Sequence, residues 1–303
     1  MREKFTVGDL TWISLNNPTK KEIRDMVEEL DIKPYLAHDL STPVPRSYTE
    51  CTDKTLKITI DYPVVKRDDL KQPHEIKLLV TKTHLVTVQF GEIDAVHQFK
   101  KEFEVGSLLK NPGRKATAVH IMFSLLHYLL NGLHHKLDYL NGRINVIDEA
   151  IHVEQEREMV REISKISRRI ISFRYILQTQ EQILSNVHSS ISKPFGTEYV
   201  DGIKELSRHH HQVIRRLRSI SDMVDELRET NIGILTTKQN EIMKTLTIIA
   251  FITFPLTLFT SIFGMNTIAT PIVGHVYDFW IIVGIMLIVS TGLFYYFKYK
   301  KWI

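Results

Sequence analysis

The chain has 303 residues, a single Cys, and 39 Lys and Arg against 35 Asp and Glu, which gives a net charge of +4. That length suits one large domain or two ordinary ones, and a hydrophobic content of 43% excludes a disordered chain. Cys51 alone cannot form a disulfide framework or a Cys-cluster metal site, and the charge is too small to indicate a nucleic-acid partner. Residues 1–5 contain no apolar run, so no secretory signal peptide is expected.

The first hundred residues mix strands with helices. Leu10–Leu15 predicts a strand, because it is rich in β-branched and aromatic residues. Pro18–Leu30 predicts a helix, in which Thr19 caps the N-terminus and Glu22 completes a capping box.

Three more strands are expected over residues 55–62, 75–80 and 84–90, with the last two joined as a hairpin. The first of them alternates apolar and polar residues, which predicts a half-buried strand. Residues 1–111 therefore form a small cytosolic α/β domain. It has no Gly-rich phosphate loop and no helical His-Glu-x-x-His pair, and no nucleophile, base and orienting group can be assembled from the sequence, so we do not expect an enzyme.

After Pro112 the chain becomes helical. Apolar residues recur at steps of three, four or seven, which predicts a long helical hairpin over residues 112–193 with a bend near His152–Arg157. Pro194-Phe195-Gly196 ends the hairpin, and no further Pro occurs before Pro255. One helix is therefore expected from about residue 198 into the first membrane span, with residues 194–244 as a stalk.

The stalk carries a heptad seam, in which apolar positions alternate steps of three and four. Its members are Ile203, Leu206, His210, Val213, Leu217, Ile220, Val224, Leu227, Asn231 and Ile234. An exposed seam of that length needs partners, so we expect the chain to associate with itself. The neighbours His209-His210-His211 point in three directions about 100° apart on a helix, so they cannot chelate one ion together.

Two uncharged runs near the C-terminus predict membrane spans, at residues 245–263 and 279–297. Each would be roughly 28 Å long as a helix, against about 30 Å of hydrocarbon. A pair of buried core helices is the alternative, but two such runs together are rare in soluble domains. The connecting loop, residues 264–278, has no Lys or Arg, whereas the tail, residues 298–303, is basic. The sequence therefore predicts a multi-pass protein of the cell membrane, and the positive-inside rule places both of its termini in the cytoplasm.

The first span is rich in hydroxyl side chains. Asn240, Met243, Thr247, Ala250, Phe254, Thr257 and Ser261 recur at steps of three or four, so they share one helix face. That face fits a pore lining. It fits equally well a stripe that faces lipid or packs on another helix, with the hydroxyls bonded back to their own backbone.

Gly264-Met265-Asn266 follows the first span directly. With the two spans, the short loop and the basic tail, this tripeptide resembles the CorA family of magnesium channels. The likeness extends over residues 240–250, 255–257, 263–266 and 296–303 and over the overall plan, which is an α+β membrane protein with a cytosolic α/β head, a helical hairpin and a stalk helix continuous with the first span. The first half of the chain matches in layout only.

The resemblance implies a homopentamer in the lipid bilayer that transports Mg²⁺, with Co²⁺ and Ni²⁺ as further candidate ions. The selectivity filter would be Gly264, Met265 and Asn266, with Asn266 binding the hydrated ion. The pore would be lined by Asn240, Met243, Leu246, Ala250, Phe254 and Thr257. Met243 and Leu246 would form its hydrophobic constriction.

The resemblance also implies that internal Mg²⁺ is a regulatory ligand of carboxylates between neighbouring cytosolic domains. The candidates on the stalk are Asp201, Glu205, Asp222, Asp225 and Glu229. A solvated helix face with ion pairs between neighbouring turns is the alternative for each of them.

Two positions depart from the family pattern. Phe254 stands where many members have Met, and the outer loop lacks the usual Glu, with Asp278 as its only carboxylate. The ion preference therefore stays open. A Zn²⁺ transporter of the related branch, which usually has Ile in place of Met265, is one alternative, and a non-transporting membrane-tethered coiled-coil scaffold is another.

Overall fold

The structure is a computed structural model. It describes residues 2–7, 9–30, 39–43, 47–52, 54–64, 73–104, 117–151, 156–265, 272–274 and 276–302. The chain forms two compact units, Met1–Arg228 and Glu229–Ile303. Helix α7 (Val200–Phe263) runs from the first into the second, as the absence of Pro before Pro255 predicts.

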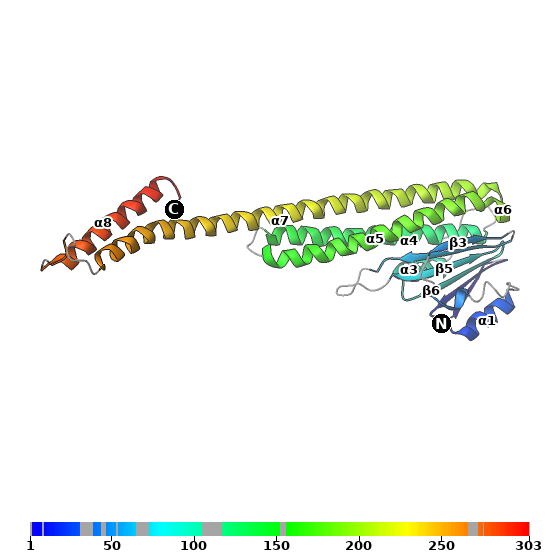
Figure 1. Ribbon diagram of the computed structural model, residues 1–303. Helices are drawn as coiled ribbons and strands as arrows, with labels where there is room; N and C mark the ends of the chain where they lie inside the picture. Colours follow the sequence, from blue (N-terminus) through cyan, green and yellow to red (C-terminus); the bar gives the residue numbers. More distant parts are fainter. Residues whose placement is uncertain are drawn as a thin grey trace. The chain divides into compact units, whose positions relative to one another are not determined.

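The first unit contains a six-stranded sheet with the strand order β1-β2-β6-β5-β4-β3 (Figure 1). The strands are β1 (Arg2–Val7), β2 (Leu10–Asn16), β3 (Tyr48–Cys51), β4 (Leu56–Tyr62), β5 (His74–Val80) and β6 (His84–Phe90). Only β2 and β6 pair in parallel among these strands; the other neighbours are antiparallel. The four predicted strands and the β5–β6 hairpin are confirmed, whereas β1 and β3 were not predicted.

Helix α1 (Lys20–Glu29) covers one face of the sheet. Its N-cap is Thr19, whose hydroxyl accepts from the Glu22 amide at 3.2 Å while the Glu22 carboxylate accepts from the Thr19 amide at 2.8 Å, so the predicted capping box is confirmed. Ile23 and Met26 of this helix pack in a buried cluster with Ile13 of β2. Alternation along β2 sends Trp12 to the opposite face, where it meets Phe99 of the unpredicted helix α3 (Asp94–Glu104) at 5.1 Å between ring centroids.

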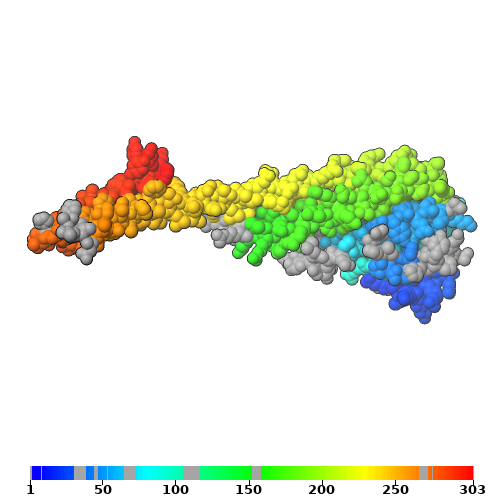
Figure 2. Space-filling model, viewed as in Figure 1, coloured from blue at the N-terminus to red at the C-terminus, as the bar shows by residue number. Residues whose placement is uncertain are grey.

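Two long helices and the start of α7 pack together on that opposite face. They are α4 (Ala118–Ile151) and α5 (Glu156–Ser190), and Figures 1 and 2 show both beside the N-terminal part of α7. The predicted bend of the hairpin at His152–Arg157 lies largely outside the described residues, as does Pro112. Gly132 of α4 allows a close approach to the sheet, because a Cβ there would lie 2.4 Å from the Tyr62 hydroxyl oxygen.

Contacts between the helices define their directions. Thr117 meets Tyr199 at 3.1 Å between oxygens, and His127 meets His209 at 3.1 Å between Nδ1 atoms; each pair is 82 residues apart, so α4 and α7 run parallel and in register. Between α5 and α7 the order reverses. Arg174 donates to Ser221 at 2.7 Å and Arg228 donates to Ser167 at 2.8 Å, so those helices are antiparallel. Both α4 and α5 therefore flank the heptad seam.

The seam is buried within the single chain. Ile203 is 0% exposed and Leu227 is 8% exposed, and the seam residues between them are buried as well. The prediction that this stretch is exposed and needs a second chain is therefore wrong for residues 203–227. The reason is that α4 and α5 of the same chain supply the partners that a coiled-coil seam requires.

Strand β4 also departs from its prediction. Lys57 and Thr59, on its polar side, are 1% and 0% exposed, so both faces of the strand are covered. The Lys57 ammonium lies 2.6 Å from Asp39, on the segment that precedes β3. Beside it, Lys77 is 0% exposed, with its Nζ 2.9 Å from a Glu75 oxygen and 2.5 Å from the Thr42 carbonyl. Burial lowers the pKa of Lys77, and the Glu75 carboxylate opposes that shift.

We expect Lys77→Met to destabilise the first unit by about 3–5 kcal/mol, because the Glu75 carboxylate would keep its buried position without the Lys77 charge. The Glu75→Leu/Lys77→Met double variant should regain most of that loss. Chemical denaturation of the purified chain measures both. A single variant as stable as the wild type would contradict the pairing.

Candidate ion pathway

The second unit holds the two helices that are long and apolar enough to cross a membrane. They are the C-terminal part of α7 and helix α8 (Asp278–Tyr299), and the predicted spans at 245–263 and 279–297 fall inside them. Pro255 lies within α7 without ending it. Both helices carry exposed apolar side chains in the single chain, such as Phe254 at 75% and Ile288 at 74%. These surfaces suit lipid or other subunits.

One face of α7 packs on α8. Ile248 is 5% exposed and Phe297 of α8 is 6% exposed, and the Phe251 and Phe297 rings lie 6.2 Å apart between centroids. Near the end of α8, Phe297 also stacks on Trp302 at 5.8 Å. The residues of α7 with reduced exposure recur at helical spacing and so share one face. They are Ile248, Ile252, Pro255, Leu256, Phe259 and Phe263.

The six residues that the sequence predicts to line a pore lie on the opposite face. All six are exposed in the single chain: Asn240, Met243, Leu246, Ala250, Phe254 and Thr257. At 100° per residue this set is centred about half a turn from the face that packs on α8. Ala250 and Thr257, a small and a polar residue of the first span, therefore lie on the side of α7 that α8 does not cover.

Each Thr of the first span donates a hydrogen bond to its own helix. Thr257, for example, donates to the Thr253 carbonyl at 2.9 Å, and Thr247 donates to Met243 at 2.7 Å. Thr245 makes the same bond to Glu241 at 3.0 Å. Back-bonding of these hydroxyls, one of the two alternatives for this face, thus occurs. It uses the hydroxyl proton and leaves the oxygen able to accept, because a hydroxyl has two lone pairs.

Helix α7 ends at Phe263, one residue before Gly264. The Gly264 amide donates to the Thr260 carbonyl at 2.9 Å, and a Cβ at Gly264 would lie 3.0 Å from that same oxygen. Met265 is 57% exposed, and Asn266 lies outside the described residues. Asp278, the carboxylate of the outer loop, accepts from the amides of Gly274 at 3.1 Å and Phe279 at 2.6 Å. It therefore stabilises the start of α8.

The five candidate regulatory carboxylates are all exposed on α7. They are Asp201, Glu205, Asp222, Asp225 and Glu229. Asp201 pairs with Lys204 at 2.9 Å and Asp225 with Arg228 at 3.5 Å, which are pairs within one helix turn. Within the described residues no three His, Cys, Asp or Glu side chains form a group that could hold a metal ion. A regulatory cation site made by one chain is thus not assembled in this part of the protein.

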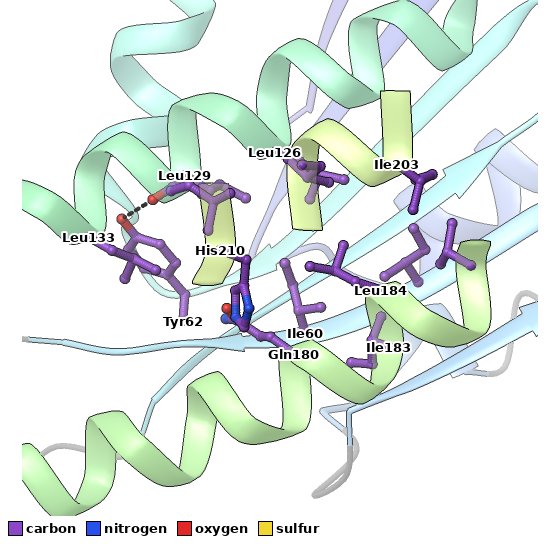
Figure 3. A pocket seen from close by; sticks show the side chains of 14 residues that line it. Ile60, Tyr62, Leu126, Leu129, Leu133, Gln180, Ile183, Leu184, Ile203 and His210 are labelled. Carbon is purple, nitrogen blue, oxygen red and sulfur yellow. Dashed lines mark hydrogen bonds between the residues drawn. The ribbon is translucent and has the colours of Figure 1, made fainter. Parts of the chain in front are cut away.

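The three adjacent histidines face three different neighbours, as their helical spacing predicts. His209 meets His127 of α4, and His211 lies 3.1 Å from Glu181 of α5. His210 points between them into a cavity under the sheet (Figure 3). The pairing of His209 with His127 was not predicted, because nothing in the local sequence reveals the 82-residue register between α4 and α7.

The cavity at His210 is small and almost wholly apolar. It has a volume of about 40 Å³ and lies among strand β4 and helices α4, α5 and α7. His210 is 1% exposed, and neither of its ring nitrogens has a hydrogen-bond partner among the described residues. Gln180, also at the cavity, donates to the Asp61 carbonyl at 2.7 Å. Burial lowers the pKa of His210 to about 4, so its ring is neutral at pH 7.

An α/β unit joined by one continuous helix to two membrane-spanning helices, one of them with an uncovered polar face, is the architecture of a membrane transporter or channel. The family model described as CorA-like Mg²⁺ transporter protein matches residues 7–300. The chain therefore belongs to the CorA-like Mg²⁺ transporter family and is a divalent cation transporter.

Individual relatives agree with that assignment. The cobalt/magnesium transport protein CorA of Thermotoga maritima is 23% identical over 297 residues, which cover 97% of this chain and 83% of that protein. The complete structure of the CorA magnesium transporter from Methanocaldococcus jannaschii is similar with a TM-score of 0.84 at 17% identity, covering 99% of this chain and 93% of that one. The ZntB cytoplasmic domain from Vibrio parahaemolyticus is similar at a TM-score of 0.60 and 11% identity, over 76% of this chain and 90% of that domain. Structural likeness at such identities establishes the fold and leaves the transported ion open.

The buried His210 should make the first unit sensitive to acid. Its pKa is about 4 in the folded chain against an ordinary value near 6.5, so between these two values the unfolded chain binds a proton that the folded chain does not. Stability should therefore fall as the pH drops from 6.5 to 4, by about 3 kcal/mol in all. His210→Leu should remove that part of the pH dependence. Denaturation of both proteins across this pH range, with chelator present, measures the difference; parallel curves would contradict the assignment.

Proposed function

We propose that the chain assembles as a homopentamer in the plasma membrane and admits Mg²⁺ to the cytoplasm along the exposed face of α7. The observation that carries the proposal is the position of Asn240, Ala250 and Thr257 on the side of α7 opposite the face that packs on α8. A closed ring of identical subunits buries such a face on every copy. Five is the number of subunits that the family resemblance implies.

The chemistry of this face suits a hydrated cation. Mg²⁺ holds its waters tightly and sheds them slowly, and the hydrogens of those waters point outward. A pore that passes the hydrated ion therefore needs acceptors. The Thr257 oxygen fits, because its proton is already donated to Thr253. The side-chain carbonyl of Asn266 would supply a second ring of acceptors at the outer mouth, with Gly264 and Met265 in the filter.

Met243 and Leu246 would form the constriction. Their side chains are 56% and 55% exposed in the single chain, and in a ring they would place ten apolar groups around the axis, two for each of about five subunits. A pore of that lining closes by excluding water. Phe254 would narrow the path further out. No charged residue occurs between Lys244 and Asp278, so selection would rest on hydration and fit.

Entry would be driven by the membrane potential, at roughly 4.6 kcal/mol per Mg²⁺ for each 100 mV. Both termini would lie in the cytoplasm, as the basic tail indicates.

Internal Mg²⁺ would close the channel by bridging carboxylates of neighbouring subunits. Asp222 and Glu229 are seven residues apart on an exposed face of α7, and Glu205 lies nearer its start. To bind Mg²⁺, Asp201 and Asp225 would first have to break their ion pairs with Lys204 and Arg228.

The proposal is tested in liposomes that hold a Mg²⁺-sensitive dye, with an inside-negative potential and the protein reconstituted in the bilayer. Thr257→Val should lower the rate of Mg²⁺ influx at least about tenfold, since each subunit loses one acceptor whose hydrogen bond contributes about 1 kcal/mol. Asn266→Ala should abolish influx.

The matched control is Thr245→Val. Thr245 makes the same back-bond as Thr257, but it lies almost half a turn around α7 from the proposed pore face. Its loss should leave the influx rate unchanged. Equal slowing by both Thr variants would contradict the assignment of the face. No influx from a folded oligomer, even after internal Mg²⁺ is removed, would overturn the Mg²⁺ proposal and make Zn²⁺ the next ion to assay. Co²⁺ and Ni²⁺ are assayed in the same vesicles by competition.

A further inference from the structure

Two imidazoles meet between the parallel helices α4 and α7, away from the proposed pore. The Nδ1 atoms of His127 and His209 are 3.1 Å apart, and the ring centroids are 5.2 Å apart. Both residues are half-buried, so neither is sealed from solvent. The two rings come from different helices, each held in place by its own buried seam.

That separation has two chemical explanations. One is a hydrogen bond, in which one Nδ1 carries a proton and the other accepts it. The other is a metal ion in place of the proton. Imidazole nitrogens bind Zn²⁺ at about 2.0–2.1 Å, so two of them lie about 2.9 Å apart at a right angle and about 3.3 Å apart in a tetrahedron. The observed 3.1 Å lies between these values.

We propose that His127 and His209 form a binding site for a first-row transition metal ion such as Ni²⁺, Co²⁺ or Zn²⁺. Two imidazoles supply the protein ligands, and water completes the coordination shell. The ring of His134 lies further away, 6.3 Å from His209 between centroids. The site has two protein ligands, since no group of three His, Cys, Asp or Glu that could hold a metal ion occurs among the described residues.

The site discriminates against Mg²⁺. Imidazole suits Ni²⁺, Co²⁺ and Zn²⁺, whereas Mg²⁺ takes oxygen ligands and keeps most of its waters. Millimolar Mg²⁺ should therefore not displace the bound ion. The ion would also link α4 to α7, the helix that continues into the first span. A protein that moves divalent cations would thus carry a site that responds to transition metals separately from Mg²⁺.

The test uses full-length protein in detergent, stripped with chelator, with Ni²⁺ as the probe in millimolar Mg²⁺. Calorimetric titration should give one Ni²⁺ per chain, and the unfolding temperature should rise on binding. His127→Ala and His209→Ala should each lower the affinity for Ni²⁺ tenfold or more, about 1.4 kcal/mol. His135→Ala is the matched control, since that side chain is exposed on the same helix α4, and it should bind like the wild type.

Two further measurements keep the outcome decisive. If an Ala variant fails to fold, His127→Gln and His209→Gln replace it, because an amide can keep a hydrogen bond across the pair while it binds the metal poorly. With Cu²⁺ as the probe, electron paramagnetic resonance should detect two imidazole nitrogens in the wild type and one in each variant. Equal Ni²⁺ affinity in all proteins, or loss with only one of the two substitutions, would overturn the site. Binding requires no flux, so this result is independent of the proposed channel.

Discussion

A backbone that enters a bilayer has to satisfy its own hydrogen bonds, and a continuous helix does this. Helix α7 extends over 64 residues, and Pro255, which has no amide proton to donate, does not end it. That continuity places one element in two environments. In the first unit its apolar seam is buried by α4, α5 and the sheet. In the second unit one face packs on α8, and the rest is exposed. Residues of the same helix therefore belong to both units.

The burial of the seam changes where self-association must come from. Over residues 203–227 the seam already has partners in its own chain, so these residues leave little apolar area for a second copy. The exposed apolar surface of α7 lies closer to its C-terminus, on the face that carries Met243, Leu246 and Phe254. These side chains are apolar, but Asn240, Ala250 and Thr257 interrupt them with polar or small groups. Such interruptions suit the ring of subunits around water that we propose.

The sequence predicts the elements of α7 well and their partners poorly. Its length follows from the lack of Pro, and the seam from the heptad spacing. The 82-residue register to α4 depends on packing between distant segments, so the His127–His209 pair could not be predicted.

The burial of Lys57 and Lys77 was not predicted, because charged residues usually lie at the surface. Here Asp39 and Glu75 offset the cost of burying the two lysines. The edge strand β1 was not predicted, because the charged residues Arg2, Glu3 and Lys4 leave it without an apolar run. In the candidate pathway the spacing predicts which residues share a face, and the structure adds that α8 packs on the other side of α7. That this face lines a pore remains our proposal.

The central claim is that the face of α7 opposite α8 lines the path of the ion. The lone Cys51 makes a direct measurement possible, since Cys51→Ala gives a chain without thiols. Ala250→Cys in that background puts one thiol on the proposed pore face, and Ile252→Cys puts one on the face that packs on α8. A membrane-impermeant, positively charged thiol reagent should block Mg²⁺ influx through the Ala250→Cys protein and leave the Ile252→Cys protein conducting. Block of neither, or of Ile252→Cys alone, would contradict the account.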